Sequence, residues 1–215
     1  MSSIQLSRIH YPVTNLGFGT RIGIWFQGCA VRCRGCVSVD TWPSRPETAV
    51  DVSWILETIA PQLVQADGVT ISGGEPTDQP EALAELLRGI RMSAGPNHDV
   101  LVYTGRSATA ALSLAPVIAT YCDALVAGPF EQDLASPSSG LRGSTNQVVA
   151  CLSALGTSRY ADADLRYSAQ RQEIGLHVDE DSVWLVGIPP SGDLAQLEVM
   201  LDAQGVHLRR KSWLT

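Results

Sequence analysis

Short apolar runs alternate with longer helical patterns along the first two thirds of the chain. The strand-like runs occupy residues 3–9, 22–26, 68–71, 100–103, 123–127 and 148–152. Between two of them, residues 83–90 carry apolar side chains at helical spacing. The repeated order of strand and helix predicts parallel βα units, and therefore an α/β fold built as a partial, open parallel βα barrel.

Local signals set the expected limits of the helices. Asp78 is a candidate cap for the helix over 83–90, because Glu81 follows three residues later in a capping-box pattern. A helix is also expected from about residue 51 to Leu63, and an alanine-rich helix is expected to reach about Ala119.

The last quarter of the chain has a different pattern. Residues 172–178 and 182–188 alternate or run apolar around an acidic turn, as in an antiparallel hairpin. Residues 193–203 predict a helix whose buried side carries Leu194, Leu197 and Leu201. We therefore expect a core over residues 1–155 and a small hairpin-plus-helix extension, 156–215, packed on it.

Charge and hydropathy narrow the possible partners. The net charge is −7, whereas non-specific nucleic-acid binding needs a basic surface, so we expect no nucleic-acid partner. No apolar run reaches membrane-spanning length, and the first ten residues lack the apolar core of a signal peptide. These features predict a soluble, cytoplasmic protein with no membrane partner.

Three of the five cysteines are concentrated in one short stretch. Cys29, Cys33 and Cys36 have the spacing Cys-x3-Cys-x2-Cys directly after the run 22–26. Three thiolates form a site for a soft metal centre. A four-iron cluster normally takes four cysteines, so three would leave one iron free to bind another molecule. The alternative is a zinc site completed by a fourth ligand, Cys122, Cys151 or His98, although zinc sites favour paired CxxC spacings. Otherwise Cys122 and Cys151 are expected to be buried free thiols.

A second motif follows the next strand-like run. It consists of Ser72, Gly73, Gly74 and Glu75, followed by Pro76. The two glycines would let a ligand approach the backbone closely, and Glu75 offers a carboxylate that could hold an ammonium group. Active sites of βα barrels lie at the carboxyl ends of the strands. Because the two motifs end consecutive parallel strands, we expect them to be neighbours on one rim.

The cysteine spacing followed by GGEP resembles the radical S-adenosylmethionine superfamily. The chain is more narrowly similar to the activating enzymes of glycyl-radical enzymes, among them those of anaerobic ribonucleotide reductase. The segments that carry this similarity are, in chain order, RIGIWFQGCAVRCRGC, TISGGEP, LVYTG, DALVAGPFEQDL and LRGSTNQ. The resemblance covers about residues 15–150. The tail is longer than those activases need.

The resemblance implies a set of functional residues. Cys29, Cys33 and Cys36 would ligate a [4Fe-4S] cluster, and Ser72, Gly73, Gly74 and Glu75 would hold the methionyl end of S-adenosyl-L-methionine. Thr104 is a candidate for contact with the cofactor, and Asn146 and Arg142 are candidate rim residues. Arg32 and Arg34 could dock a flavodoxin- or ferredoxin-like electron donor, although exposed loop charges are the simpler interpretation.

The implied activity is reductive cleavage of S-adenosylmethionine to a 5′-deoxyadenosyl radical, which installs a glycyl radical on a partner enzyme. One alternative is a radical enzyme of the same superfamily that modifies a peptide or a small heterocycle. A second alternative is a non-catalytic iron–sulfur protein for electron transfer or binding, but such a carrier needs no amine-binding turn.

Overall fold

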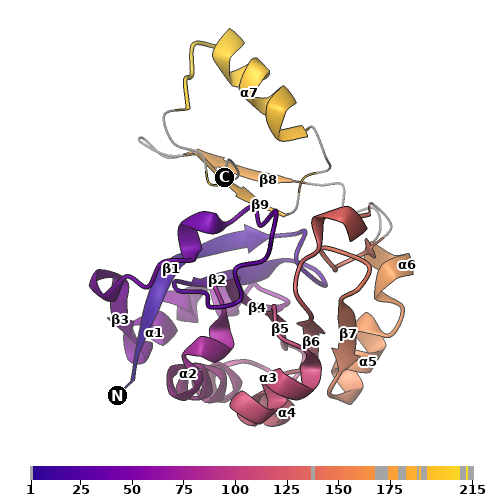
Figure 1. Cartoon of the computed structure of the whole chain (residues 1–215). Coiled ribbons are helices and arrows are strands. Elements are labelled where there is room, and N and C mark those ends of the chain that lie inside the picture. Colours follow the sequence, from indigo (N-terminus) through magenta and orange to yellow (C-terminus); the bar gives the residue numbers. More distant parts are fainter. Residues whose placement is uncertain are drawn as a thin grey trace.

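A computed structural model of the chain describes residues 2–136, 139–167, 174–178, 183–187, 189, 193–208 and 212. Seven strands of this described part form one sheet in the order β3-β1-β2-β4-β5-β6-β7 (Figure 1). The parallel strands at its centre are β2 (Arg21–Phe26), β4 (Gly68–Gly73), β5 (Asp99–Thr104) and β6 (Ala124–Ala127). Their carboxyl ends therefore meet at one edge of the sheet.

Antiparallel strands flank this parallel centre. On one side, β1 (Ser3–Val13) pairs with β2, and β3 (Ala49–Asp51) pairs with β1. On the other side, β7 (Val148–Cys151) pairs with β6. Among the described residues, β3 and β7 have no further strand on their outer sides, so the sheet stays open. The predicted α/β fold with an open, mostly parallel sheet is confirmed.

Four helices lie together on one side of the sheet (Figure 1). They are α1 (Val52–Leu63), α2 (Pro80–Ser93), α3 (Ala108–Leu114) and α4 (Val117–Tyr121). The apolar stripe predicted on α2 is fully enclosed in the core, at Leu83, Leu86, Leu87 and Ile90. Burial of this stripe against the apolar strands drives the packing of the helices on the sheet.

Two predicted helix limits were wrong. Gln79, not Asp78, precedes α2, because Pro76–Asp78 forms a separate 3-10 turn, η3. The alanine-rich helix ends at Leu114 and a second one begins after Pro116, because a proline cannot donate its backbone nitrogen to the helical ladder. Other 3-10 turns of the same length are η1 (Val39–Thr41), η2 (Pro46–Thr48) and η4 (Gln132–Leu134).

A buried ion pair joins the first residues of two parallel strands. The guanidinium of Arg21 donates to both carboxylate oxygens of Asp99 at 2.9 Å, and neither side chain is exposed. Tyr160 and Arg159, from α5 (Ala154–Tyr160), also donate to this carboxylate. Burial alone would raise the pKa of Asp99, but the charge and hydrogen bonds of Arg21 outweigh it and keep that pKa below its usual value.

Two helices beside β7 lead into the last part of the chain, which continues above the sheet (Figure 1). After α5 comes α6 (Ala163–Tyr167), and Tyr160 and Tyr167 of these helices pack in a second apolar cluster with Leu101 and Val126. Then β8 (Gly175–Val178) and β9 (Val183–Val186) form the predicted antiparallel hairpin. The remaining predicted hairpin positions 172–173, 179–182 and 188 lie outside the described residues. The division of the chain at residue 155 stays a prediction.

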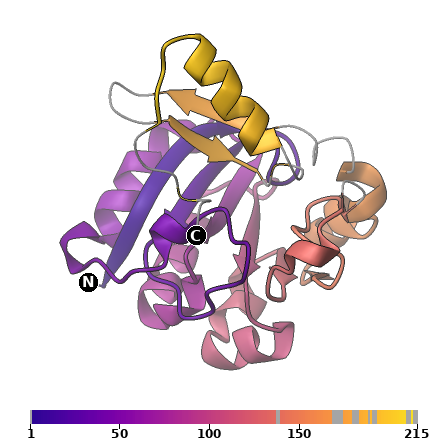
Figure 2. The ribbon, with the colours of Figure 1, turned by 45° about the horizontal axis from the view of Figure 1, so that its top comes forward.

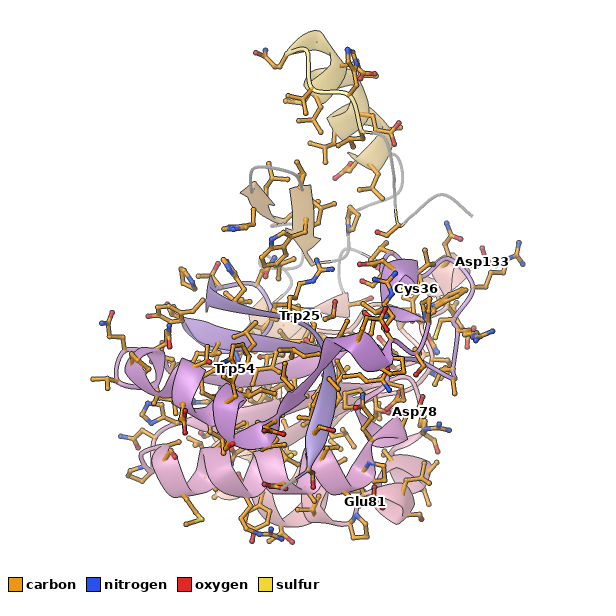
Figure 3. The ribbon with its side chains drawn as sticks, turned by 90° about the vertical axis from the view of Figure 1, so that its left-hand side faces the viewer. Trp25, Cys36, Trp54, Asp78, Glu81 and Asp133 are labelled. Carbon is orange, nitrogen blue, oxygen red and sulfur yellow. The ribbon has the colours of Figure 1, made fainter. Side chains whose placement is uncertain are left out.

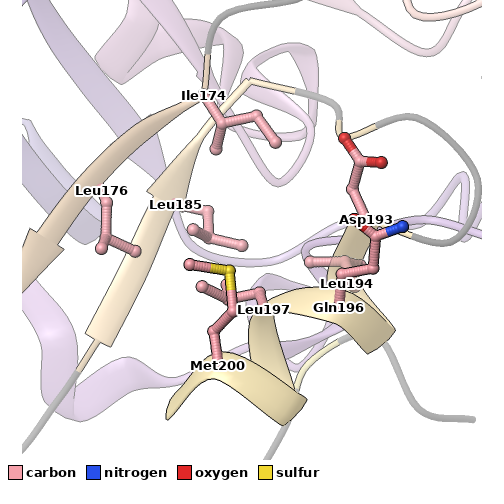
Figure 4. Close-up of a pocket in the computed structure, with 8 residues that line it drawn as sticks. All are labelled: Ile174, Leu176, Leu185, Asp193, Leu194, Gln196, Leu197 and Met200. Atoms are coloured by element: carbon pink, nitrogen blue, oxygen red, sulfur yellow. The ribbon is translucent and has the colours of Figure 1, made fainter. Parts of the chain in front are cut away.

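Helix α7 (Asp193–Ala203) has the predicted bounds but not the predicted burial. It lies over the hairpin (Figure 2), and none of its residues is buried. Between them is a cavity of about 260 Å³, lined by Leu176, Leu185, Leu194, Leu197 and Met200 among others (Figure 4). The apolar side of α7 therefore faces the hairpin across this cavity, rather than a closed core. No helix in the described part of the chain combines the length and apolar character needed to cross a membrane.

Candidate functional site

The loop after β2 carries the three clustered cysteines. Its base is fixed where Gly28 N donates to Thr41 O at 2.8 Å and Cys29 N donates to Trp42 O at 3.0 Å. Arg32 and Gly35 have φ values of 51° and 77°, in the left-handed region that curls the chain tightly. The chain thus forms a compact loop here, and the backbone hydrogen bonds at its base fix the part of the loop that carries the first cysteine.

The three loop cysteines are half-buried free thiols. Backbone N–H groups donate to two of their sulfurs, from Phe130 to Cys33 at 3.3 Å and from Ser38 to Cys36 at 3.4 Å. Burial raises the pKa values of Cys29 and Cys33. Ligation of a metal centre would therefore release protons from them. Such N–H donors around sulfur ligands are one of the means by which proteins tune iron–sulfur clusters.

The described residues contain no group of three histidine, cysteine, aspartate or glutamate side chains that could hold a single metal ion. Cys122 is buried in the main core, and His98 contacts the Leu63 carbonyl at 2.8 Å. A four-iron cluster, in contrast, takes one thiolate at each iron, so its ligands do not converge on one point. The donor set of the loop, three sulfurs with backbone N–H partners, fits such a cluster.

The turn after β4 contacts the cysteine loop through its backbone. Gly74 N donates to Phe26 O, and Glu75 N donates to Gly28 O, both at 2.8 Å. A Cβ on Gly74 would lie 2.1 Å from the carbonyl oxygen of Gly28, so the contact requires glycine. The two motifs expected to be neighbours on the rim are thus brought together in space, through parallel pairing of β2 with β4.

Glu75 is fully buried, and its carboxylate is held by donors of the protein itself. Oε1 accepts from Thr77 N at 3.0 Å, from Thr77 Oγ1 at 2.7 Å and from Thr104 Oγ1 at 2.8 Å. Oε2 accepts from Gly105 N at 2.8 Å. The sequence presented Glu75 and Thr104 as separate cofactor contacts, whereas the structure binds them to each other.

A charged pair that no sequence motif indicated lies beside this turn. Asp78 accepts a 2.7 Å hydrogen bond from Ala30 N, in the cysteine loop, and forms an ion pair with Arg106. Arg106 Nε also donates to Thr77 Oγ1 at 3.0 Å. Figure 3 shows Asp78 below Cys36 on the same side of the molecule. No local sequence pattern identifies this pair, because the residues around Asp78 match a helix-capping motif equally well.

Arg142 and Asn146 stabilise the loop between η4 and β7. Arg142 Nη1 donates to the carbonyls of Thr145 and Gln147 at 2.8 Å, and its guanidinium pairs with Asp164. Asn146 Nδ2 donates to Pro129 O at 2.8 Å, while its buried Oδ1 has no hydrogen-bond partner among the described residues. Of the two, Arg142 lines the cavity described next.

A cavity of about 160 Å³ lies at the carboxyl ends of the central strands. It is lined by Asn15, Leu16, Trp25, Cys36, Val37, Ser38, Ser72, Gly73, Tyr103, Phe130, Gly140, Leu141, Arg142, Leu185 and Gly187. Among the candidate residues, Cys36, Ser72, Gly73 and Arg142 line it. Trp25 and Cys36, which both line the cavity, lie below the extension in Figure 3.

A family model described as a 4Fe-4S single cluster domain matches residues 15–150. The chain belongs to this family. The match contains all three loop cysteines and the turn after β4, and it ends before the extension. The iron–sulfur family inferred from the cysteine spacing is therefore confirmed, and the [4Fe-4S] cluster is its cofactor.

Several curated relatives share this family segment. The anaerobic ribonucleoside-triphosphate reductase-activating protein of Pasteurella multocida is 34% identical over 148 residues, which are 65% of this chain and 93% of the relative. Its Escherichia coli K12 counterpart is 31% identical over 146 residues, 65% of this chain and 94% of the relative. A putative glycyl-radical enzyme activating enzyme of Haemophilus influenzae is 35% identical over 91 residues, covering 41% and 34% of the two chains.

Among solved structures, QueE from Escherichia coli aligns with a TM-score of 0.40 and 20% identity, covering 49% of this chain and 54% of QueE. A similarity at this level supports no further conclusion about the site.

Proposed function

We propose that this protein is a radical S-adenosylmethionine activase, which cleaves S-adenosylmethionine reductively at its [4Fe-4S] cluster to install a glycyl radical on a partner enzyme. The observation that supports this most directly is the 2.8 Å backbone bond from Glu75 to Gly28, which joins the cysteine loop to the glycine turn. The names of the relatives, activating proteins of an anaerobic reductase, point to the same activity.

In this proposal, Cys29, Cys33 and Cys36 would hold the cluster through one thiolate each, and the fourth iron would be left for the cofactor. When bound, the cluster and S-adenosylmethionine supply one-electron chemistry: the cofactor is split into methionine and 5′-deoxyadenosine, whose added hydrogen atom comes from the target. The protein contributes binding, orientation and exclusion of side reactions. The N–H donors to Cys33 and Cys36 hold those thiolates in place.

The turn after β4 would hold the methionyl end of the cofactor. Ser72 and Gly73 line the cavity, and Gly74 lets the turn approach the cysteine loop. The carboxylate of Glu75 supplies negative charge for an ammonium group, and its Oε2 accepts one hydrogen bond from the described residues, from Gly105 N. Thr104 acts by orienting Glu75. Asn146 remains a candidate contact, because its buried Oδ1 has no partner in the described part of the chain.

The partner in this proposal is a glycyl-radical enzyme, and the electron comes from a flavodoxin- or ferredoxin-like donor. Arg32 and Arg34 are exposed on the cysteine loop, where they can attract an acidic donor. We place the reaction in the cytoplasm, since all five cysteines are free thiols, as expected in a reducing compartment.

A second candidate is a radical enzyme acting on a peptide or a small heterocycle. The extension favours it, because Leu185 and Gly187 form part of the cavity wall and narrow the approach for a large target.

Anaerobic reconstitution tests the main proposal. The iron-loaded protein, reduced with dithionite in the presence of S-adenosylmethionine, should form 5′-deoxyadenosine. Cys33→Ala should abolish it, and Cys151→Ala, at a half-buried cysteine outside the site, should not. Adding the anaerobic ribonucleotide reductase of the same organism should then give a glycyl-radical signal in electron paramagnetic resonance. Formation of 5′-deoxyadenosine without that signal would favour the second candidate, and equal formation by Cys33→Ala would refute both.

A further inference from the structure

The hairpin of the extension reaches the candidate active site, although it lies outside the family segment 15–150. Leu185 and Gly187, at the end of β9, line the same cavity as Cys36, Gly73 and Tyr103. Figure 2 shows the hairpin lying across β1, between the sheet and α7. A segment outside the family match thus forms part of the wall of the cavity.

Trp184 attaches β9 to the sheet. Its ring meets the His10 ring edge-on at 4.6 Å and the Trp25 ring at 5.9 Å, while the guanidinium of Arg8 lies 5.3 Å from its centre. Trp25 itself lines the cavity. Alternate residues of a strand point to opposite faces, so Trp184 points to the sheet while Leu185 points toward α7 (Figure 4).

Two hydrogen bonds attach the extension at other points of the cavity. Asn15 Nδ2 donates to the carbonyl of Val186 at 2.7 Å in a buried contact. Ser212 Oγ donates to the carbonyl of Val37, the residue after Cys36, at 2.8 Å. Asn15 and Val37 both line the cavity. The extension is therefore bonded both to the loop before β2 and to the cysteine loop.

We propose that β9 is a wall of the active-site cavity that limits which hydrogen donors reach it, and that Trp184 is the residue that positions this wall. The proposal rests on the proposed function for its chemistry, since a reactive intermediate must be shielded from solvent and small molecules. With β9 in place, the hydrogen atom added to 5′-deoxyadenosine comes from the intended target. With β9 loosened, small molecules enter the cavity and donate this hydrogen atom instead.

The first test uses the iron-loaded full-length protein with S-adenosylmethionine, dithionite and perdeuterated 2-propanol as a small hydrogen donor. Mass spectrometry of the 5′-deoxyadenosine measures the deuterium taken from the alcohol. Trp184→Ala should raise this deuterium content roughly threefold or more, the factor that loss of an aromatic pair produces in an opening equilibrium. Trp184→Phe should restore most of the shielding. The matched control is Leu176→Ala, which removes an apolar side chain facing α7 on the same hairpin.

A second measurement is independent of the cofactor chemistry. In the cluster-free protein, iodoacetamide should alkylate Cys36, which lines the cavity, faster in Trp184→Ala than in the unsubstituted chain. Cys29 does not line it and serves as the internal reference. Amide exchange of β8 and β9 reports whether the substitution loosened the hairpin.

The possible outcomes distinguish the proposed role of β9 as a cavity wall from the proposed enzymatic activity. Unchanged deuterium content and unchanged Cys36 alkylation in Trp184→Ala would overturn the proposal, whether or not the hairpin exchanges faster. An equal effect of Leu176→Ala would overturn the role given to Trp184. If the unsubstituted protein forms no 5′-deoxyadenosine, the proposed function fails, and faster Cys36 alkylation in Trp184→Ala still supports the wall.

Discussion

The buried carboxylate of Glu75 leads to a prediction that separates its structural role from any cofactor contact. In Glu75→Gln the side chain keeps its shape but has one acceptor atom instead of two. If the amide oxygen takes the place of Oε1, it keeps the bonds from Thr77 and Thr104. The amide nitrogen then faces the N–H of Gly105, and two donors oppose each other. The opposite orientation leaves the threonine donors unpaired.

The expected cost follows from this geometry. One buried donor without an acceptor costs about 1–3 kcal/mol, and the substitution also removes the charge that strengthens the remaining bonds. We therefore expect a loss of about 2 kcal/mol in the free energy of unfolding. For a chain of this size, that corresponds to a melting temperature lower by roughly 4–8 °C.

Thermal unfolding of the cluster-free protein, followed by circular dichroism under anaerobic conditions, measures this cost without cofactor binding. The matched control is Glu81→Gln, at an exposed glutamate in the first turn of α2 (Figure 3), which should change stability by less than about 0.5 kcal/mol. If Glu75→Gln has the same melting temperature as the control, the four hydrogen bonds of the carboxylate do not stabilise the folded protein as expected.

Three further predictions concern the rim and the buried ion pair. Asp78→Asn weakens the tether to the cysteine loop, so iron bound per chain after reconstitution should fall, as measured by colorimetric iron analysis; full iron content would contradict a tethering role. Gly74→Ala places a Cβ against the Gly28 carbonyl, so iron content and melting temperature should both fall. Asp99→Asn should cost about 3–5 kcal/mol by leaving Arg21 without its counter-charge, measured by urea unfolding.

The same carboxylate gives a pH dependence with a definite sign. The Asp99 pKa is lower in the folded than in the unfolded protein. Its stabilisation is therefore complete above the unfolded value of about 4 and is lost as the pH falls through the folded value. Melting temperatures measured from pH 7 downward should show this loss in the unsubstituted chain and a shallower one in Asp99→Asn; equal slopes would contradict it.

Sequence patterns predicted most elements that depend on neighbours along the chain. The apolar runs gave strands β2, β4, β5 and β6, and the helical stripe gave α2, because burial of one face follows from the local period of the residues. Where local signals competed, the prediction failed. Asp78 matches a helix cap, yet its carboxylate binds Ala30, which is 48 residues away.

The sequence alone determined the family and the order of the parts: a three-cysteine loop after one strand and a glycine turn after the next, on the same rim of a parallel sheet. Only the tertiary structure decided what these residues contact. Glu75 meets Thr104, and Asn15 meets the carbonyl of Val186 at a separation of 171 residues. Such partners are selected when the core is packed and buried polar groups must be satisfied, and no local pattern in the chain encodes that choice.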